Sequence, residues 1–152
     1  MAIEYTIVDN INQVGRVLSS GTTDNPARMG YKIDAPTVLR PEIKVIVGQG
    51  MRDDDVWWNG TAFVLRPSLD ATNKFTNEND WVADGVDEIT YGPNLPNPTK
   101  VTIACDSYLF IPIAPVTVTD GQLEMTATLK GTYKLTLEAF PYLDKVIEVK
   151  AN

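Results

Sequence analysis

The stretch that decides the fold is Gly131-Thr132-Tyr133-Lys134-Leu135-Thr136-Leu137-Glu138-Ala139, where apolar and polar side chains alternate. A repeat of two residues is typical of a β-strand, because successive side chains of a strand point to opposite faces. The preceding stretch, 123–130, alternates in the same way, with Leu123, Met125, Ala127 and Leu129 as its apolar members. We expect the two stretches to be neighbouring strands of one antiparallel sheet, with one face in the core and the other in water. No window has a convincing helical repeat, so the sequence predicts an all-β protein.

Composition argues against several kinds of function. The 152 residues include 13 basic and 20 acidic side chains, for a net charge of −7, with no histidine and one cysteine. An acidic chain without a run of lysine or arginine is a poor partner for nucleic acid or an anionic membrane. Without histidine, the usual base of a hydrolytic triad and a common zinc ligand are both missing. We therefore expect no enzymatic activity, no catalytic residues, no metal, no other cofactor, and neither nucleic acid nor membrane as a partner.

The remaining reactive groups are one thiol and several carboxylates. Cys105 continues the alternation of Val101 and Ile103, which predicts a small buried side chain rather than a catalytic thiolate. Carboxylates occur as a run at 53–55 and as a looser group within 78–87. Such groups can hold calcium or act as acid and base, but their spacing matches no EF-hand loop. We interpret both as solvated acidic turns, with structural calcium and catalysis as the less favoured alternatives.

A second local signal is the tryptophan-rich stretch Val56-Trp57-Trp58-Asn59-Gly60-Thr61-Ala62-Phe63-Val64. An Asn-Gly pair between two strand-like arms predicts a hairpin with a two-residue type I′ turn, which would place Trp57 opposite Ala62 and Val56 opposite Phe63. Adjacent tryptophans on a strand point to opposite faces, so one can enter the core while the other needs a different cover. A neighbouring loop is one such cover, and another protein chain is the alternative. The predicted interface consists of Trp57, Trp58 and Phe63, with Asp53, Asp54 and Asp55 in its polar rim.

The chain divides most naturally at a polar stretch without any period, residues 68–80. We predict a linker there. It would separate a hairpin-rich β domain at 1–67 from a second β domain at 81–152. The first eight residues lack the basic and apolar regions of a signal peptide, so synthesis in a cytoplasm without export is expected.

Three pieces of the C-terminal part carry a family resemblance: the ADGVDEIT stretch at 83–90, the LPNPTKVTI stretch at 95–103, and the GTYKLTLEAFPYL stretch at 131–143. Together they resemble the invasin-like and bacterial immunoglobulin-like modules of tailed-bacteriophage virion proteins and bacterial surface proteins. The last residues also look like the ending of small tail-associated phage proteins. The resemblance covers a little under half of the chain, and it implies an immunoglobulin-like β-sandwich at 81–152.

The N-terminal part is similar, more weakly, to accessory proteins found beside phage tail fibres, through Gly15–Gly21, the tryptophan hairpin and the exit at Arg66-Pro67. The resemblance implies a non-enzymatic structural or decoration protein of a tailed-phage virion, made in the host cytoplasm. Residues 1–67 would dock on the tail, the fibre base or the capsid surface, and the sandwich would be displayed. The implied partners are other virion proteins and further copies of this chain, in a homo-oligomer or multi-copy assembly.

A carbohydrate- or receptor-binding module is the alternative function. Flat aromatic rings stack on sugars, and Trp57, Trp58, Trp81 and Tyr108 offer such rings. A hydrolase or lyase acting through Asp53–Asp55 is the third and least favoured class.

Overall fold

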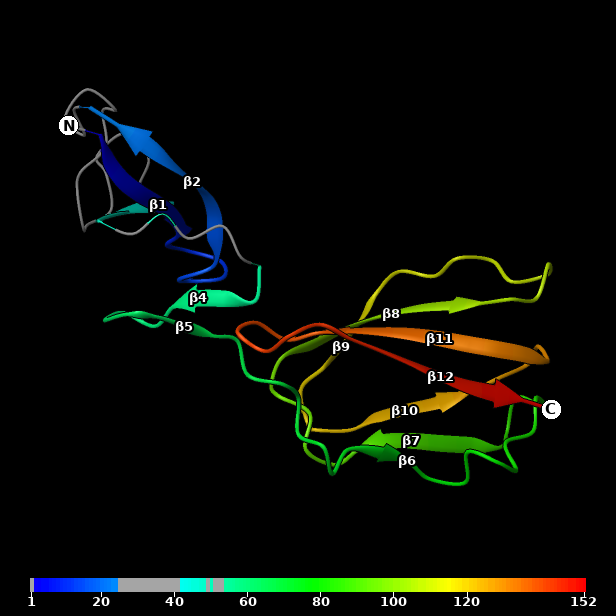
Figure 1. The fold of residues 1–152 in the computed structure, drawn as a ribbon. Coiled ribbons are helices and arrows are strands. Elements are labelled where there is room, and N and C mark those ends of the chain that lie inside the picture. Colours follow the sequence, from blue (N-terminus) through cyan, green and yellow to red (C-terminus); the bar gives the residue numbers. More distant parts are fainter. Residues whose placement is uncertain (1, 25–41, 49, 51–53) are drawn as a thin grey trace. The chain divides into compact units, whose positions relative to one another are not determined.

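The chain forms two compact units, Met1–Arg66 (unit 1) and Pro67–Asn152 (unit 2), in a computed structural model that describes residues 2–24, 42–48, 50 and 54–152 (Figure 1). Every named element in these residues is a β-strand and every strand pairing is antiparallel, so the protein is all-β, as predicted. Within the same residues, no helix is long and apolar enough to cross a membrane.

Unit 1 contains a three-stranded sheet and a two-stranded hairpin. The sheet has the order β2-β1-β3, formed by β1 (Ile3–Asp9), β2 (Val17–Thr23) and β3 (Ile43–Val47). The hairpin consists of β4 (Val56–Trp58) and β5 (Phe63–Leu65). Val8 in the central strand and Val45 in β3 are almost fully buried. The β-branched residues that favour strands therefore supply the core of this unit.

Unit 2 contains seven strands in two sheets. One sheet has the order β10-β7-β6, formed by β6 (Lys74–Phe75), β7 (Glu88–Gly92) and β10 (Leu123–Thr126). The other has the order β12-β11-β8-β9, formed by β8 (Thr99–Cys105), β9 (Val116–Val118), β11 (Gly131–Glu138) and β12 (Lys145–Ala151). Buried residues of both sheets belong to one apolar cluster, so the sheets pack face to face on a common core.

The alternation of the sequence is visible in the burial of β11. Tyr133, Leu135 and Leu137 are buried, whereas Lys134 between them is exposed. Trp81, with 0% of its surface exposed, lies in the same core with its ring centroid 5.2 Å from that of Tyr133. The expectation of one buried and one solvated face is therefore confirmed for this strand.

The predicted pairing of the stretch 123–130 with the stretch 131–139 is wrong. β10 pairs with β7 in the first sheet, whereas β11 pairs with β8 and β12 in the second sheet (Figure 1). The four residues between them carry the chain from one sheet to the other. Alternation shows only that each strand has an inner and an outer face, and this holds equally for strands in two sheets that share a core.

The predicted linker at 68–80 is also corrected, because this segment belongs to unit 2. Leu69 is buried in the core, and β6 pairs with β7. The polar side chain of Asn73 is buried as well: it donates from Nδ2 to the carbonyl oxygen of Asn94 (3.1 Å) and accepts from the Asn94 amide (2.6 Å). Most of the polar side chains in this segment are exposed, but Leu69 and the hydrogen-bonded Asn73 anchor it to unit 2.

The crossing between the two sheets is fixed by Tyr133 near the start of β11. Its hydroxyl donates a hydrogen bond to the carbonyl oxygen of Leu129, at 2.9 Å, in the segment that has just crossed over. Burial raises the pKa of the Tyr133 hydroxyl above its ordinary value of 10.0, with Cys105 as a smaller contributor. The group stays protonated at neutral pH, as a donor must.

Replacing Tyr133 by Phe should lower the free energy of unfolding of unit 2 by about 1 kcal/mol, because it removes one partly buried hydrogen bond and leaves the Leu129 carbonyl without its donor. The matched control is Tyr108→Phe, since Tyr108 is 93% exposed and its hydroxyl is in water. Urea unfolding of the full chain, followed by the NMR signal of the Trp81 indole N–H, measures both. Equal stabilities of the two variants would contradict this role for Tyr133.

Candidate functional site

The tryptophan hairpin, residues 56–65, forms as predicted but in a different register. The pairs are Val56 with Leu65, Trp57 with Val64, and Trp58 with Phe63, so Val56 and Trp57 each pair two residues further along the chain than predicted. The Asn59 side-chain oxygen accepts the amides of Thr61 (3.0 Å) and Ala62 (2.9 Å). Gly60 alone in this turn has a positive φ, at 100°.

This geometry moves the turn one residue along the chain. Asn59 becomes the last residue of the first arm, where its amide donates to the Ala62 carbonyl at 3.1 Å. Gly60 and Thr61 are then the two central residues, and glycine in the first central position is typical of a type II′ turn. The Asn-Gly pair correctly predicted a tight hairpin, and the side chain of Asn59 decided its register.

The hairpin is held to the rest of unit 1 by the loop that follows β1. The Trp58 amide donates to the carbonyl oxygen of Gly15 (2.8 Å), and Arg16 forms an isolated β-bridge with Trp57. Gly15 has a φ of +91°, and a Cβ atom there would lie 1.9 Å from the Trp58 carbonyl oxygen. Only glycine fits at this contact, because it allows both the positive φ and the close approach of two backbones.

Asp9 stiffens the same loop. Its carboxylate accepts three backbone amides, from Ile11 (2.9 Å), Asn12 (3.0 Å) and Gln13 (3.1 Å). Burial by itself raises the pKa of Asp9, but these donors, together with the charge of Arg16, hold it below the ordinary value of 3.8. The loop is therefore a defined support for the hairpin at neutral pH.

Both tryptophans of the hairpin are half-buried. Trp58 contacts the Phe63 ring edge-on, with centroids 5.1 Å apart, and the Lys44 ammonium lies 5.7 Å from its ring centroid. Within the described residues, the buried Trp58 Nε1 has no hydrogen-bond partner. Each tryptophan thus keeps part of its ring surface open, rather than one being core and the other exposed.

A cavity of about 260 Å³ adjoins the hairpin inside unit 1. It is lined by Val8, Asp9, Asn10, Val14, Gly15, Lys44, Trp57, Trp58, Asn59 and Gly60. Two indole rings thus meet an acidic, a basic and two amide side chains. The sequence pattern did not mark Asp9, Gly15 and Lys44 as site residues, and the one local signal for them was the turn composition that follows β1.

The other residues of the predicted interface are spread along the hairpin. Phe63 is half-buried against Trp58, and Asp53 lies outside the described residues. Asp54 and Asp55 are exposed at the open end of the hairpin, where their carbonyl oxygens accept hydrogen bonds from Arg66. Their carboxylates are thus close in sequence to the tryptophans but do not line the cavity.

The two aromatic residues of unit 2 that were predicted for sugar binding, Trp81 and Tyr108, differ in exposure. Trp81 is fully buried, and its Nε1 donates to the carbonyl oxygen of Asp87 at 3.1 Å. It cannot offer a flat face to a ligand, so this part of the alternative hypothesis is wrong. Tyr108 is almost fully exposed.

The looser acidic group in unit 2 has a structural use. Asp84 accepts the amides of Val86 (2.8 Å) and Asp87 (2.7 Å), which lowers its pKa, and the Asp87 carboxylate accepts the Val82 amide (2.8 Å). In the parts of the chain that the structure describes, no three His, Cys, Asp or Glu side chains are grouped as a metal site would need. Cys105 is half-buried and packs against the core of unit 2.

Comparison of the chain with protein-family models, with curated proteins and with solved structures gives no match. Function is therefore inferred from the two units and their surfaces.

The close approach at Gly15 gives a sharp test of how the hairpin is positioned. Gly48→Ala is the matched control, since Gly48 has a φ of +93° but no atom within 4 Å of the added methyl. Gly48→Ala should cost about 1 kcal/mol, from the left-handed backbone alone. Gly15→Ala should cost at least about 2 kcal/mol more, because the methyl group must push the hairpin away.

Urea unfolding of unit 1, followed by the NMR signal of the Trp58 indole N–H, measures both variants. In Gly15→Ala that signal should also shift in the folded state. Equal costs for the two variants would mean that Gly15 does not set the position of the hairpin.

Proposed function

We propose that this protein is a non-enzymatic structural protein of a tailed-phage virion. Unit 1 docks on the particle through the tryptophan hairpin and its cavity, and unit 2 is displayed as an immunoglobulin-like module. The observation that carries the proposal is the surface of the hairpin, where β4 holds two partly open indole rings and the loop after β1 supports them.

The support for an immunoglobulin-like module comes from strand order and from Tyr133. Unit 2 has a three-stranded and a four-stranded antiparallel sheet, and the chain changes sheet between β7 and β8, β9 and β10, and β10 and β11. Immunoglobulin-like sandwiches have a tyrosine near the start of their second-to-last strand. Its hydroxyl hydrogen-bonds to the backbone a few residues upstream. Tyr133, at the third residue of β11 and with its hydroxyl hydrogen-bonded to the Leu129 carbonyl, fits that description. The resemblance of residues 81–149 to phage and surface modules agrees with it.

The support for docking comes from the chemistry of the hairpin surface. Tryptophan is enriched among residues that dominate binding energy, because a single ring buries a large area with little loss of side-chain entropy. Around Trp57 and Trp58 lie Lys44, which adds a cation beside the ring, and the exposed acidic residues Asp54 and Asp55 nearby in sequence. An apolar centre with charged surroundings is typical of protein interfaces.

Replacing Trp57 or Trp58 by Ala should reduce incorporation into particles at least tenfold, because each ring supplies contact area that a partner would bury. Val86→Ala is the control, since Val86 is exposed and belongs to unit 2 rather than to the hairpin. Quantitative mass spectrometry of purified virions measures incorporation, and NMR spectra of the isolated variants check that they fold. The absence of the unaltered protein from virions, or normal incorporation of both folded tryptophan variants, would overturn the proposal.

A carbohydrate-binding module is the second candidate, and the cavity in unit 1 is the observation in its favour. Two indole rings beside Asp9, Asn10 and Lys44 combine a stacking surface with hydrogen-bonding groups, which is the combination that sugar rings require.

On a glycan array, this candidate predicts saturable binding of the full chain that Trp57→Ala or Trp58→Ala abolishes and Tyr108→Ala leaves unchanged. No binding to any glycan, or equal loss in all three variants, would count against it.

A further inference from the structure

The most exposed apolar part of unit 2 is a single segment, residues 108–116, between β8 and β9. Its exposed members are Tyr108, Leu109, Ile111, Ile113 and Val116, and Ile111 is 79% exposed. Two prolines within the segment, Pro112 and Pro115, lack the N–H that a sheet ladder needs. The segment therefore stays outside the sheets, and β9 begins only at its last residue.

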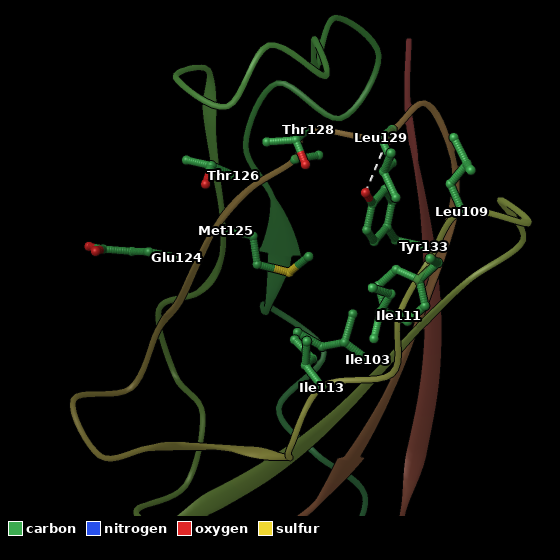
Figure 2. A pocket seen from close by; sticks show the side chains of 12 residues that line it. Ile103, Leu109, Ile111, Ile113, Glu124, Met125, Thr126, Thr128, Leu129 and Tyr133 are labelled. Carbon is green, nitrogen blue, oxygen red and sulfur yellow. Dashed lines mark hydrogen bonds between the residues drawn. The ribbon is translucent and has the colours of Figure 1, made fainter.

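This apolar segment forms one wall of a cavity of about 480 Å³ in unit 2. In Figure 2, Leu109 and Ile111 lie on one side and Met125 and Thr126, from β10, on the other. Ile103, Tyr133 and Leu129 add further apolar surface. Glu124 is the one charged residue in the lining, and its side chain points away from the cavity (Figure 2).

The opposite wall is the edge of a sheet. β10 is the outermost strand in the order β10-β7-β6, and its one pairing in the described chain is with β7. An edge strand presents unpaired backbone groups that another strand can use. A backbone edge, a hollow and a raised apolar segment therefore lie next to one another on one surface.

We propose that two copies of this chain associate through this surface, with their β10 edges facing and the apolar segment of each copy covering the cavity of the other. A two-fold symmetric contact uses the same patch on both copies, so the patch must complement itself. This one has that property, because the hollow and the apolar ridge that could cover it are side by side on the same molecule.

The spacing of residues along β10 fits an antiparallel pairing of the two edges. If the two-fold axis of the dimer passes through Met125, Leu123 faces Ala127 of the second copy and Glu124 faces Thr126 of the second copy. Buried residues then face buried residues, since Leu123, Met125 and Ala127 all point into the core. An axis at Glu124 would instead bring two carboxylates together, which disfavours that register.

The exposed area is close to what such a contact needs. The five exposed side chains of the apolar segment together present on the order of 500 Å² of apolar surface. A standard interface buries about 800 Å² on each partner, and the β10 edge and the cavity lining supply the rest. A patch of this size on an isolated unit is at the upper end for a monomer, which favours a protein partner over solvent.

Sedimentation equilibrium of the full chain, between about 1 μM and about 100 μM, tests the inference over the affinities usual for such contacts. We expect a reversible monomer–dimer equilibrium. Ile111→Asp should weaken it at least tenfold, because a carboxylate would be buried in the contact. Val86→Asp is the matched control: Val86 is equally exposed, at 81%, but lies outside the cavity, so this variant should dimerise normally.

A second readout is hydrogen exchange at the β10 amides, which should slow with protein concentration in the unaltered chain and not in Ile111→Asp. At concentrations low enough for all three proteins to be monomeric, both variants should keep the unfolding midpoint of the unaltered chain, because the substituted side chains are in water in the monomer. A monomer throughout the range would overturn the inference. So would equal dimerisation of both variants, or loss of the dimer in Trp58→Ala with Ile111→Asp unaffected.

The inference goes beyond the proposed function and does not depend on it. The measurement uses the isolated protein, so a protein that is absent from virions could still dimerise through unit 2, and one that is present could still be a monomer.

Discussion

The position of Trp81 is the constraint on which the arrangement of unit 2 depends. Its indole is fully buried against Tyr133 of β11, and its Nε1 donates to the carbonyl of Asp87, just before β7 begins. Its own carbonyl accepts the amide of Asn152, at the end of β12, at 2.9 Å. One residue therefore joins both sheets through its side chain and its backbone, and the shared core can form only where these contacts are satisfied together.

The two edge strands of unit 2, β12 and β10, are covered to different extents. On the β12 side, the backbone around Trp81 covers the end of the edge strand, and the Ala83 amide donates to the Asn152 carbonyl at 3.0 Å. On the β10 side, the edge faces the cavity, and the apolar segment 108–116 stands beside it, with Phe110 packed against the core and the other large apolar side chains exposed. Proteins protect sheet edges by covering them or by using them. The covered edge serves stability, and the open edge is where we propose that two copies associate.

In unit 1, backbone hydrogen bonds likewise hold a tryptophan-bearing segment, the hairpin, in place. A three-residue pairing between β4 and β5 is too short to hold two tryptophans in place by itself, because an isolated hairpin is marginally stable in water. The Gly15 carbonyl and the loop capped by Asp9 supply the missing support. The partly open indole rings are thus presented on a preformed surface, which lowers the entropy that a partner would otherwise have to overcome on binding.

The local sequence pattern alone determined the all-β fold class, the inner and outer faces of β11, and the existence of a tight turn at Asn59-Gly60. Each depends on residues a few positions apart, whose alternation or backbone freedom is read directly from the sequence. The partner of each strand in unit 2, the inclusion of 68–80 in that unit and the burial of Trp81 were decided by tertiary structure. So were the two cavities, since Gly15 meets Trp58, and Ile111 and Met125 line one cavity, only after distant segments come together. Alternating residues can satisfy any sheet that shares the core, so the choice among them is made by contacts that no short window contains.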